Sequence, residues 1–319
     1  MAKGEIDSRL RETVNAQFGG LAAEIRAFAP DQIIEFAPDH FNGFFYDLMP
    51  SFCVGVHAAS LGDWGGQTGK LPVDERFASE LAAAVLGDEV DVAVSYRMHV
   101  DHGFVQIWEK MFGRFDAYPI VPIFINCAAP PLPRFRRARL LGEAVGRYAL
   151  ASGKRVLFAA SGGLSHDPPA PDFTTATPEI RERLIDGRHP TMGMRDAREA
   201  RVLEAGRLAA RGEGPCLPLN ATWDSEVLAL LRAGELARFD ALNMTDVRRT
   251  AGRGAAEVLC WVAAFAALSV AGPYAVGTSF YTPIPGWIAG MAMLSAHSSA
   301  RDVRAGAPAL CDSRGNRPA

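Results

Sequence analysis

The chain has 319 residues, of which 49% are hydrophobic and 22% are charged, so it can build the sizeable core of a globular protein. The net charge of −3 argues against a nucleic-acid-binding surface. Five scattered cysteines without a CxxC pair argue against a disulfide framework and a cysteine zinc site, and they fit a reducing cytosol.

We expect neither a signal peptide nor a membrane-spanning segment in this sequence. The N-terminus lacks the apolar core that a signal peptide needs. The longest apolar stretch, residues 257–272, is shorter than the ~20 residues of a membrane span and indicates a buried helix. We therefore expect a cytoplasmic protein whose partners include neither a membrane nor a nucleic acid.

Helices and strands alternate along the first part of the chain. Apolar residues at helical spacing predict a helix over residues 7–28, and the apolar run at residues 32–37 predicts a short strand. A second amphipathic helix is predicted over residues 74–87. Residues 91–104 then read as a strand that ends at Asp101 and His102, and a helix follows near residues 105–112.

The alternation continues beyond residue 118. The nearly continuous apolar run at residues 118–126 is typical of a strand in a sheet that is covered on both faces. A helix is predicted over residues 136–152, and a strand that starts at residue 155 runs into a Gly-Gly turn and His166. Residues 167–190, rich in Pro and Thr, predict a long surface excursion. Further helices are expected near residues 193–212, 223–233 and 255–271.

This order of elements predicts an α/β fold of three layers, in which helices flank a central, mostly parallel or mixed sheet. We expect a single catalytic domain over residues 1–299 and a polar tail over residues 300–319. Open α/β sheets often begin with a strand, whereas this chain opens with a helix. We therefore expect that a first strand is missing from the chain.

Three predicted strands end in histidine, at Asp39-His40, Asp101-His102 and Ser165-His166. In open α/β sheets, ligands bind beyond the carboxyl ends of the strands, so these three side chains should converge. Imidazole is both a metal ligand and the proton-transfer group best suited to neutral pH. The remaining histidines lack this setting and are expected to be structural or solvated: His57, His99, His189 and His297.

Glu257 stands at the head of an otherwise apolar helix. A carboxylate there is either a helix-dipole residue or a buried group that needs a cation, and a metal would supply that cation. Two other segments resemble known catalytic or binding motifs but do not match them. The segment "GGLSHD" is not a Gly-x-Ser-x-Gly nucleophile elbow. The segment "GDWGGQTGKL", residues 62–71, departs from the phosphate-loop pattern and is interpreted as a surface turn.

With these residues in view, the chain resembles the class III extradiol ring-cleaving dioxygenases. The segments that carry the resemblance occur in the family's order: "FAPDHFNGFFYDLMPSFCVG", "VDHGF", "PIFIN", "PLPRFRRARLLGEAVGRY", "ASGGLSHDPP" and "WVAAFAA…PIPGWIAG". The resemblance implies meta cleavage of 2,3-dihydroxyphenylpropionate or 2,3-dihydroxycinnamate by O2, in the catabolism of aromatic acids, by a homo-oligomer that uses Fe(II).

The family's functional residues are carried over onto four positions. The resemblance implies that His40 and Glu257 are metal ligands, that His102 is a proton donor and that His166 is a proton acceptor. The family's second histidine ligand lies in a Ser-His-(Ser/Thr)-Pro-Leu motif that would precede Met1. We hypothesise that the true start lies upstream.

The competing hypothesis is a paralogue that has lost this ligand and acts as a non-catalytic or metal-impaired binding protein. A third class is a metal-dependent hydrolase that uses the same pocket without consuming oxygen. Oxygen uptake distinguishes these alternatives.

Overall fold

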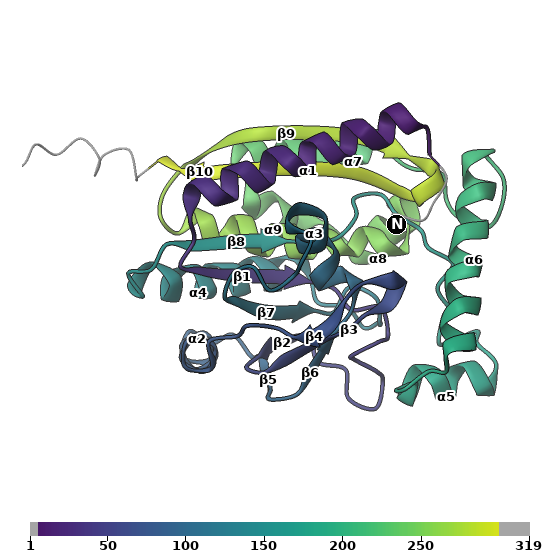
Figure 1. The fold of residues 1–319 in the computed structure, drawn as a ribbon, viewed down its shortest axis with the longest axis horizontal. Helices are drawn as coiled ribbons and strands as arrows, with labels where there is room; N and C mark the ends of the chain where they lie inside the picture. The colour runs from purple at the N-terminus through teal and green to yellow at the C-terminus, as the bar shows by residue number, and fades with distance from the viewer. Residues whose placement is uncertain (1–5, 300–319) are drawn as a thin grey trace, which may run out of the picture.

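The fold, taken from a computed structural model that describes residues 6–299, is organised around a five-stranded sheet (Figure 1). The strands lie in the order β5 (Ala93–Ser95), β2 (Phe52–Gly55), β7 (Ile120–Ile125), β1 (Gln32–Ala37) and β8 (Val156–Ala160). Strand β1 runs parallel to both β7 and β8, whereas β2 runs antiparallel to β7. The sheet is therefore mixed, as predicted.

Helices cover both faces of this sheet, which confirms the three layers. On one face, Ile34 and Phe36 of β1 join a core formed with α2 (Glu75–Gly87), α4 (Phe135–Ala151) and α9 (Val258–Ser269). On the other face, Ile33 and Ala37 pack with residues of α3 (His102–Phe112), against which α1 (Ser8–Phe28) lies. Alternate residues of a strand point to opposite faces, so β1 contributes to both cores.

The predicted strand over residues 91–104 is wrong in its extent. It is two short strands, β5 and β6 (Met98–Val100), separated by a bend. At the bend, Ser95 Oγ accepts a hydrogen bond from the backbone N–H of Arg97, a local bond that competes with strand pairing. Strand β6 belongs to a separate three-stranded sheet with β3 (Ala58–Leu61) and β4 (Thr68–Lys70). His102 therefore starts a helix and does not follow a strand of the main sheet.

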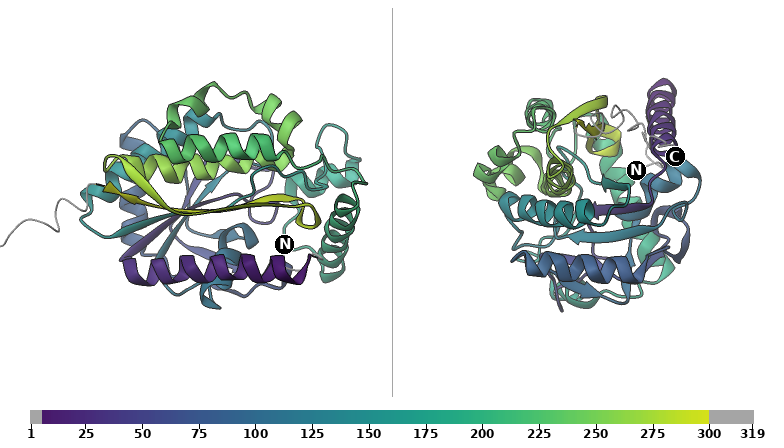
Figure 2. Two further views of the ribbon diagram at one scale, coloured as in Figure 1. Left: turned by 90° about the horizontal axis from the view of Figure 1, so that it is seen from above. Right: turned by 90° about the vertical axis from the view of Figure 1, so that its left-hand side faces the viewer.

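The second half of the chain is mostly helical, and its last two strands were not predicted. The helices are α5 (Pro178–Asp186), α6 (Met192–Ala210), α7 (Ala221–Ala233), α8 (Met244–Ala251) and α9, so the helices predicted near residues 193–212, 223–233 and 255–271 are confirmed. Strands β9 (Tyr274–Ile284) and β10 (Ala289–Ser298) form an antiparallel hairpin. Figure 2 shows this hairpin running between α1 and the helices of the C-terminal half.

Short 3-10 helices link several of these elements: η1 (Asp63–Gly65), η2 (Leu236–Ala241), η3 (Arg253–Glu257) and η4 (Pro285–Trp287). Helix α9, which follows Glu257, is held close to α4 by two glycines. A Cβ atom on Gly142 would lie 2.1 Å from the carbonyl oxygen of Ala263, and one on Gly146 would lie 2.4 Å from that of Ala267. Only glycine permits this approach, which fixes the position of α9 over the sheet.

Strand β8 forms one wall of a cavity of about 2510 Å³. It pairs with β1 along one edge, and its five residues are only half-buried, although they are apolar. Among residues 6–299, no strand pairs with its other edge. The hypothesis that a further strand precedes Met1 stays a prediction.

No helix within the described part of the chain is long and apolar enough to cross a membrane. The described cysteines, Cys53, Cys127, Cys216 and Cys260, are free thiols, as the spacing predicted. The polar tail predicted over residues 300–319, with Cys311, lies outside the described residues.

Glu35, in the middle of β1, is a buried carboxyl group whose burial was not predicted from the sequence. It is 0% exposed, and neither of its carboxylate oxygens makes a hydrogen bond of normal geometry within the described structure. Burial raises the pKa of Glu35 well above its ordinary value of 4.5, and the nearby Trp108 indole offsets only part of this effect. Burial therefore favours the protonated, neutral form of Glu35 in the folded protein.

Replacing Glu35 with Leu is expected to stabilise the protein by about 1–3 kcal/mol near neutral pH, the usual cost of an unsatisfied buried polar group. Because the folded pKa is raised, the wild-type protein loses stability as pH rises from the unfolded value of 4.5 toward the folded value. The gain should thus shrink when urea unfolding is measured near pH 4.5. A Glu35→Gln control also removes the titration. A less stable Leu variant, or a gain that does not change with pH, would contradict this account.

Candidate active site

The carboxyl ends of three parallel strands deliver the residues of the site. In Figure 1, β8, β1 and β7 point the same way, toward the side of the molecule where α6 stands. His40 follows β1, Cys127 follows β7, and Gly163 follows β8. Glu257, at the start of α9, meets them there, and all four residues line the cavity. This placement is the one expected for a ligand site of an open α/β sheet.

The loop after β1 is built by Asp39. Its buried carboxylate accepts hydrogen bonds from the backbone N–H groups of Asn42, Gly43 and Phe44 at 3.0, 2.8 and 3.2 Å. A Cβ atom on Gly43 would lie 2.0 Å from the carbonyl oxygen of His99, so glycine is required at this position. The segment "DHFNG" therefore folds into a tight turn that presents His40 to the cavity.

Glu257 is a buried carboxylate, only 5% exposed. Its Oε2 accepts a hydrogen bond from the backbone N–H of Gly163 at 2.7 Å, and its Oε1 lies 3.4 Å from Nε2 of His40. Burial acts to raise the pKa of Glu257, but the hydrogen bond and charge of His40 and the hydrogen bond from the Gly163 N–H act against it, and the pKa is lowered. The group is therefore an anion, and the alternative of a simple helix-dipole residue does not describe it.

His40 is held by Asp101, whose Oδ2 lies 3.0 Å from the ring Nδ1 and 2.9 Å from the His40 backbone nitrogen. This contact directs Nε2 toward Glu257. Burial would lower the pKa of His40, but the charges and hydrogen bonds of Asp101 and Glu257 raise it well above the ordinary value. The protonated form of His40 is thus favoured, because its positive charge would lie between two buried carboxylates.

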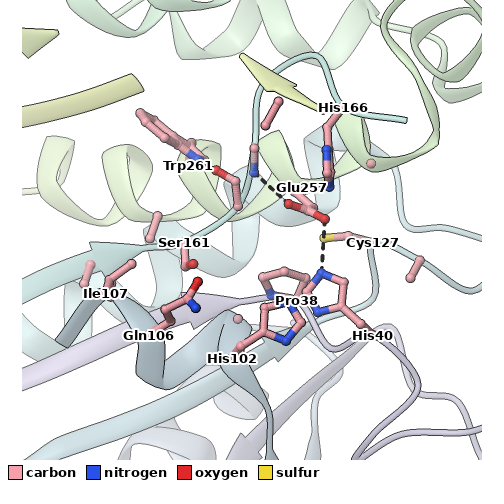
Figure 3. A pocket seen from close by; sticks show the side chains of 18 of the residues that line it. Pro38, His40, His102, Gln106, Ile107, Cys127, Ser161, His166, Glu257 and Trp261 are labelled. Carbon is pink, nitrogen blue, oxygen red and sulfur yellow. Dashed lines mark hydrogen bonds and ion pairs between the residues drawn. The ribbon is translucent and has the colours of Figure 1, made fainter. Parts of the chain in front are cut away.

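His102 lies beside His40, with the two rings stacked at a centroid distance of 4.5 Å (Figure 3). Its Nδ1 lies 2.6 Å from Oδ2 of Asp63, and the backbone N–H of His102 donates to Oδ1 of the same carboxylate at 2.8 Å. The Trp64 ring meets the His102 ring in an edge-on arrangement, with the two ring centroids 6.0 Å apart. Asp63 therefore fixes the ring and, as a hydrogen-bond acceptor, favours the tautomer with a proton on Nδ1.

His166 is fixed from the opposite side of the cavity. Its Nδ1 lies 2.5 Å from the carbonyl oxygen of Ile288 and donates a hydrogen bond to it, so in the neutral ring the lone pair is on Nε2. A Cβ atom on Gly254 would lie 2.3 Å from Cδ2 of His166, so the ring fits only against glycine. Figure 3 shows Glu257 between His166 and His40.

The structure thus brings together all four residues that the sequence singled out: His40, His102, His166 and Glu257. His102 arrives by an unexpected route, from the start of α3 and not from the main sheet. Interpreting residues 62–71 as a mere surface turn was wrong, because Asp63 binds His102. No local signal marks this partner: Asp63 lies 39 positions from His102.

The donor set fits a metal ion. His40, Asp101 and His102 each place one ligand atom within 4.8 Å of the others. However, Asp101 already accepts hydrogen bonds from His40, from the Asn42 side chain at 2.8 Å and from the Gly103 backbone at 2.9 Å. It therefore suits the role of orienting His40, as carboxylates behind metal-binding histidines do. Nε2 of His40 and Oε1 of Glu257 are the better-placed pair, since a cation there would balance the charge of the buried Glu257 carboxylate.

The chain is similar to known proteins over most of its length. Residues 1–292 match the family described as "Catalytic LigB subunit of aromatic ring-opening dioxygenase". The 2,3-dihydroxyphenylpropionate/2,3-dihydroxicinnamic acid 1,2-dioxygenase of Rhodococcus jostii (strain RHA1) is 49% identical over 296 residues, which cover 93% of this chain and 94% of that protein. The protein of the same name from Photorhabdus laumondii is 48% identical and covers 93% of each chain. The family match spans every site residue described above.

Proposed function

The chain belongs to the family of the catalytic LigB subunit of aromatic ring-opening dioxygenases, and from this membership we propose that it cleaves 2,3-dihydroxyphenylpropionate or 2,3-dihydroxycinnamate with O2. The family is one of extradiol enzymes, so the ring opens beside the two hydroxyls and not between them. The relatives that carry this substrate in their names are 47–49% identical to the chain, which supports the same substrate here. Homo-oligomeric assembly and a cytoplasmic location remain predictions from the sequence.

We propose that the metal is Fe(II) and that His40 and Glu257 hold it. The observation that carries this proposal is the meeting of His40 Nε2 and Glu257 Oε1 at 3.4 Å, with Asp101 behind the imidazole. Non-haem iron oxygenases use a set of two histidines and one carboxylate with further open positions, of which His40 and Glu257 would supply one histidine and the carboxylate. When bound, iron supplies the redox chemistry between the catechol and O2.

His166 is proposed as the proton acceptor. Its Nδ1 donates to the carbonyl oxygen of Ile288, so the free lone pair is on Nε2. A catechol hydroxyl in the cavity can pass its proton to this atom, which leaves the substrate oxygen with a negative charge. His166 is only 8% exposed, so little bulk water competes for the lone pair.

His102 is proposed as the proton donor. Asp63 takes a hydrogen bond from Nδ1, which leaves Nε2 as the ring atom that can give a proton to an oxygen of the opening ring. The side chain is 16% exposed and stacks on His40, which holds it beside the metal-binding pair. The two histidines therefore lie in environments that suit opposite directions of proton transfer.

The direct test is oxygen uptake by iron-loaded protein supplied with 2,3-dihydroxyphenylpropionate. We expect one O2 consumed per substrate and a yellow ring-fission product. A protein that binds the catechol without consuming O2 would support the binding-protein alternative. Turnover of ester or amide analogues without O2 would support the hydrolase. Either result would overturn the proposed function.

A further inference from the structure

A substrate that carries an acid on its side chain needs a positive group in the cavity. The proposed substrates place a carboxylate about three carbon–carbon bonds from the ring, roughly 4 Å at standard bond lengths. Taking such a group out of water without a charged or multiple hydrogen-bond partner is costly. Arginine is well suited to this task, because its planar fork of N–H groups matches a carboxylate.

Arg198, on α6, is the cation whose position meets this need. Its Nη2 donates to the backbone carbonyl oxygen of His40, and its Nη1 donates to Oδ1 of Asn42 at 3.2 Å. The guanidinium therefore lies against the turn that presents a proposed metal ligand. Arg198 also lines the cavity, and its side chain is half-buried.

The contacts of Arg198 differ from those of two other cations that line the cavity, Arg253 and Lys154. Arg253 is paired with Asp167 at 2.9 Å, and Lys154 with Asp74 at 3.4 Å. Both acceptors of Arg198, by contrast, are neutral oxygens. A guanidinium has five N–H donors, so N–H groups remain for an incoming carboxylate while both contacts persist.

Helix α6, which bears Arg198, is held in position by close packing against η4. A Cβ atom on Gly206 would lie 2.4 Å from the carbonyl oxygen of Gly286, so α6 packs directly against η4 through glycine. The residue that follows η4 is Ile288, whose carbonyl oxygen binds His166. The helix that carries Arg198 thus packs on η4, and the residue directly after η4 holds His166. Figure 1 shows α6 standing at the end of the sheet where the strands deliver the site.

On the basis of the proposed function, we propose that Arg198 binds the side-chain carboxylate of the substrate and selects catechols that carry an acid. It touches a part of the substrate remote from the reacting oxygens, so it determines specificity and is not an acid or base of the reaction. Its contacts with His40 and Asn42 hold the guanidinium in place before the substrate arrives, which reduces the entropy lost on binding.

The test compares 2,3-dihydroxyphenylpropionate with 3-propylcatechol, which keeps the ring and the three-carbon chain but has no carboxylate. For Arg198→Gln we expect kcat/KM for the acid to fall about 10- to 100-fold, mainly through KM, as for a lost charged hydrogen bond. The value for 3-propylcatechol should change less than about threefold. Arg198→Lys keeps the charge and should recover part of the loss for the acid.

The control is Arg207→Gln, the same change on the same helix at an exposed arginine that pairs with Glu204 and does not line the cavity. It should leave both substrates unaffected. An equal loss for both substrates in Arg198→Gln would show that Arg198 only positions the His40 turn, and no loss for the acid would show that it has no role; each result overturns the inference. If the wild-type protein cleaves neither catechol, the proposed function fails instead.

Discussion

His102→Ala and His166→Ala should each lower kcat for 2,3-dihydroxyphenylpropionate by about 10²- to 10⁴-fold, the usual contribution of general acid–base catalysis. The reason is that the Nδ1 atoms of the two rings have different hydrogen-bond partners. Asp63 supports a proton on His102, whereas the carbonyl oxygen of Ile288 leaves a lone pair on His166. The measurement is the initial rate of O2 uptake with saturating iron and substrate.

His57→Ala is the matched control, because His57 pairs with Glu75 at the surface, away from the cavity. It should keep wild-type kcat. The two active-site variants should also retain iron, since neither histidine is a proposed ligand. If either variant keeps wild-type kcat, that histidine does not transfer a proton in the rate-limiting part of the reaction.

Glu257→Gln should lose iron and with it nearly all activity. Residues that only orient metal ligands typically contribute 10- to 100-fold to metal affinity, so loss of a ligand should lower affinity by more than about 100-fold. The amide keeps the size of the side chain and can still accept from the Gly163 N–H, so the fold around α9 should survive. The measurement is iron per chain after dialysis, together with O2 uptake.

A second buried carboxylate offers the control for this experiment. Glu35 is 0% exposed but lies in the interior of β1, outside the cavity lining. Glu35→Gln should retain iron and activity. Wild-type iron content in Glu257→Gln would refute the assignment of Glu257 as a ligand, even if activity were lost.

The order of secondary-structure elements was readable from the sequence because it depends on neighbouring residues. The 3.6-residue period of the segment at 7–28 and the apolar run at 118–126 each favour one backbone conformation locally, and both elements form there. The buried Glu257 was also predictable, because a carboxylate that precedes ten apolar positions must enter the core with them.

The break between β5 and β6 and the hairpin β9–β10 were not predictable in the same way. Residues 91–104 have the apolar pattern of one strand, but the Ser95 turn and the packing of β6 on β3 divide them between two sheets. Strands β9 and β10 stabilise each other through pairing along their lengths, and neither has a strong local signal.

The sequence by itself determined which residue types could perform chemistry: three histidines, each directly after Asp or Ser, and one glutamate before an apolar helix. Only the tertiary structure decided what each one can do. The partners that set the proton positions, Asp63 for His102 and Ile288 for His166, lie 39 and 122 positions away along the chain. A histidine's tautomer and charge depend on the atoms that surround its ring, and those atoms come from segments that meet only when the chain folds.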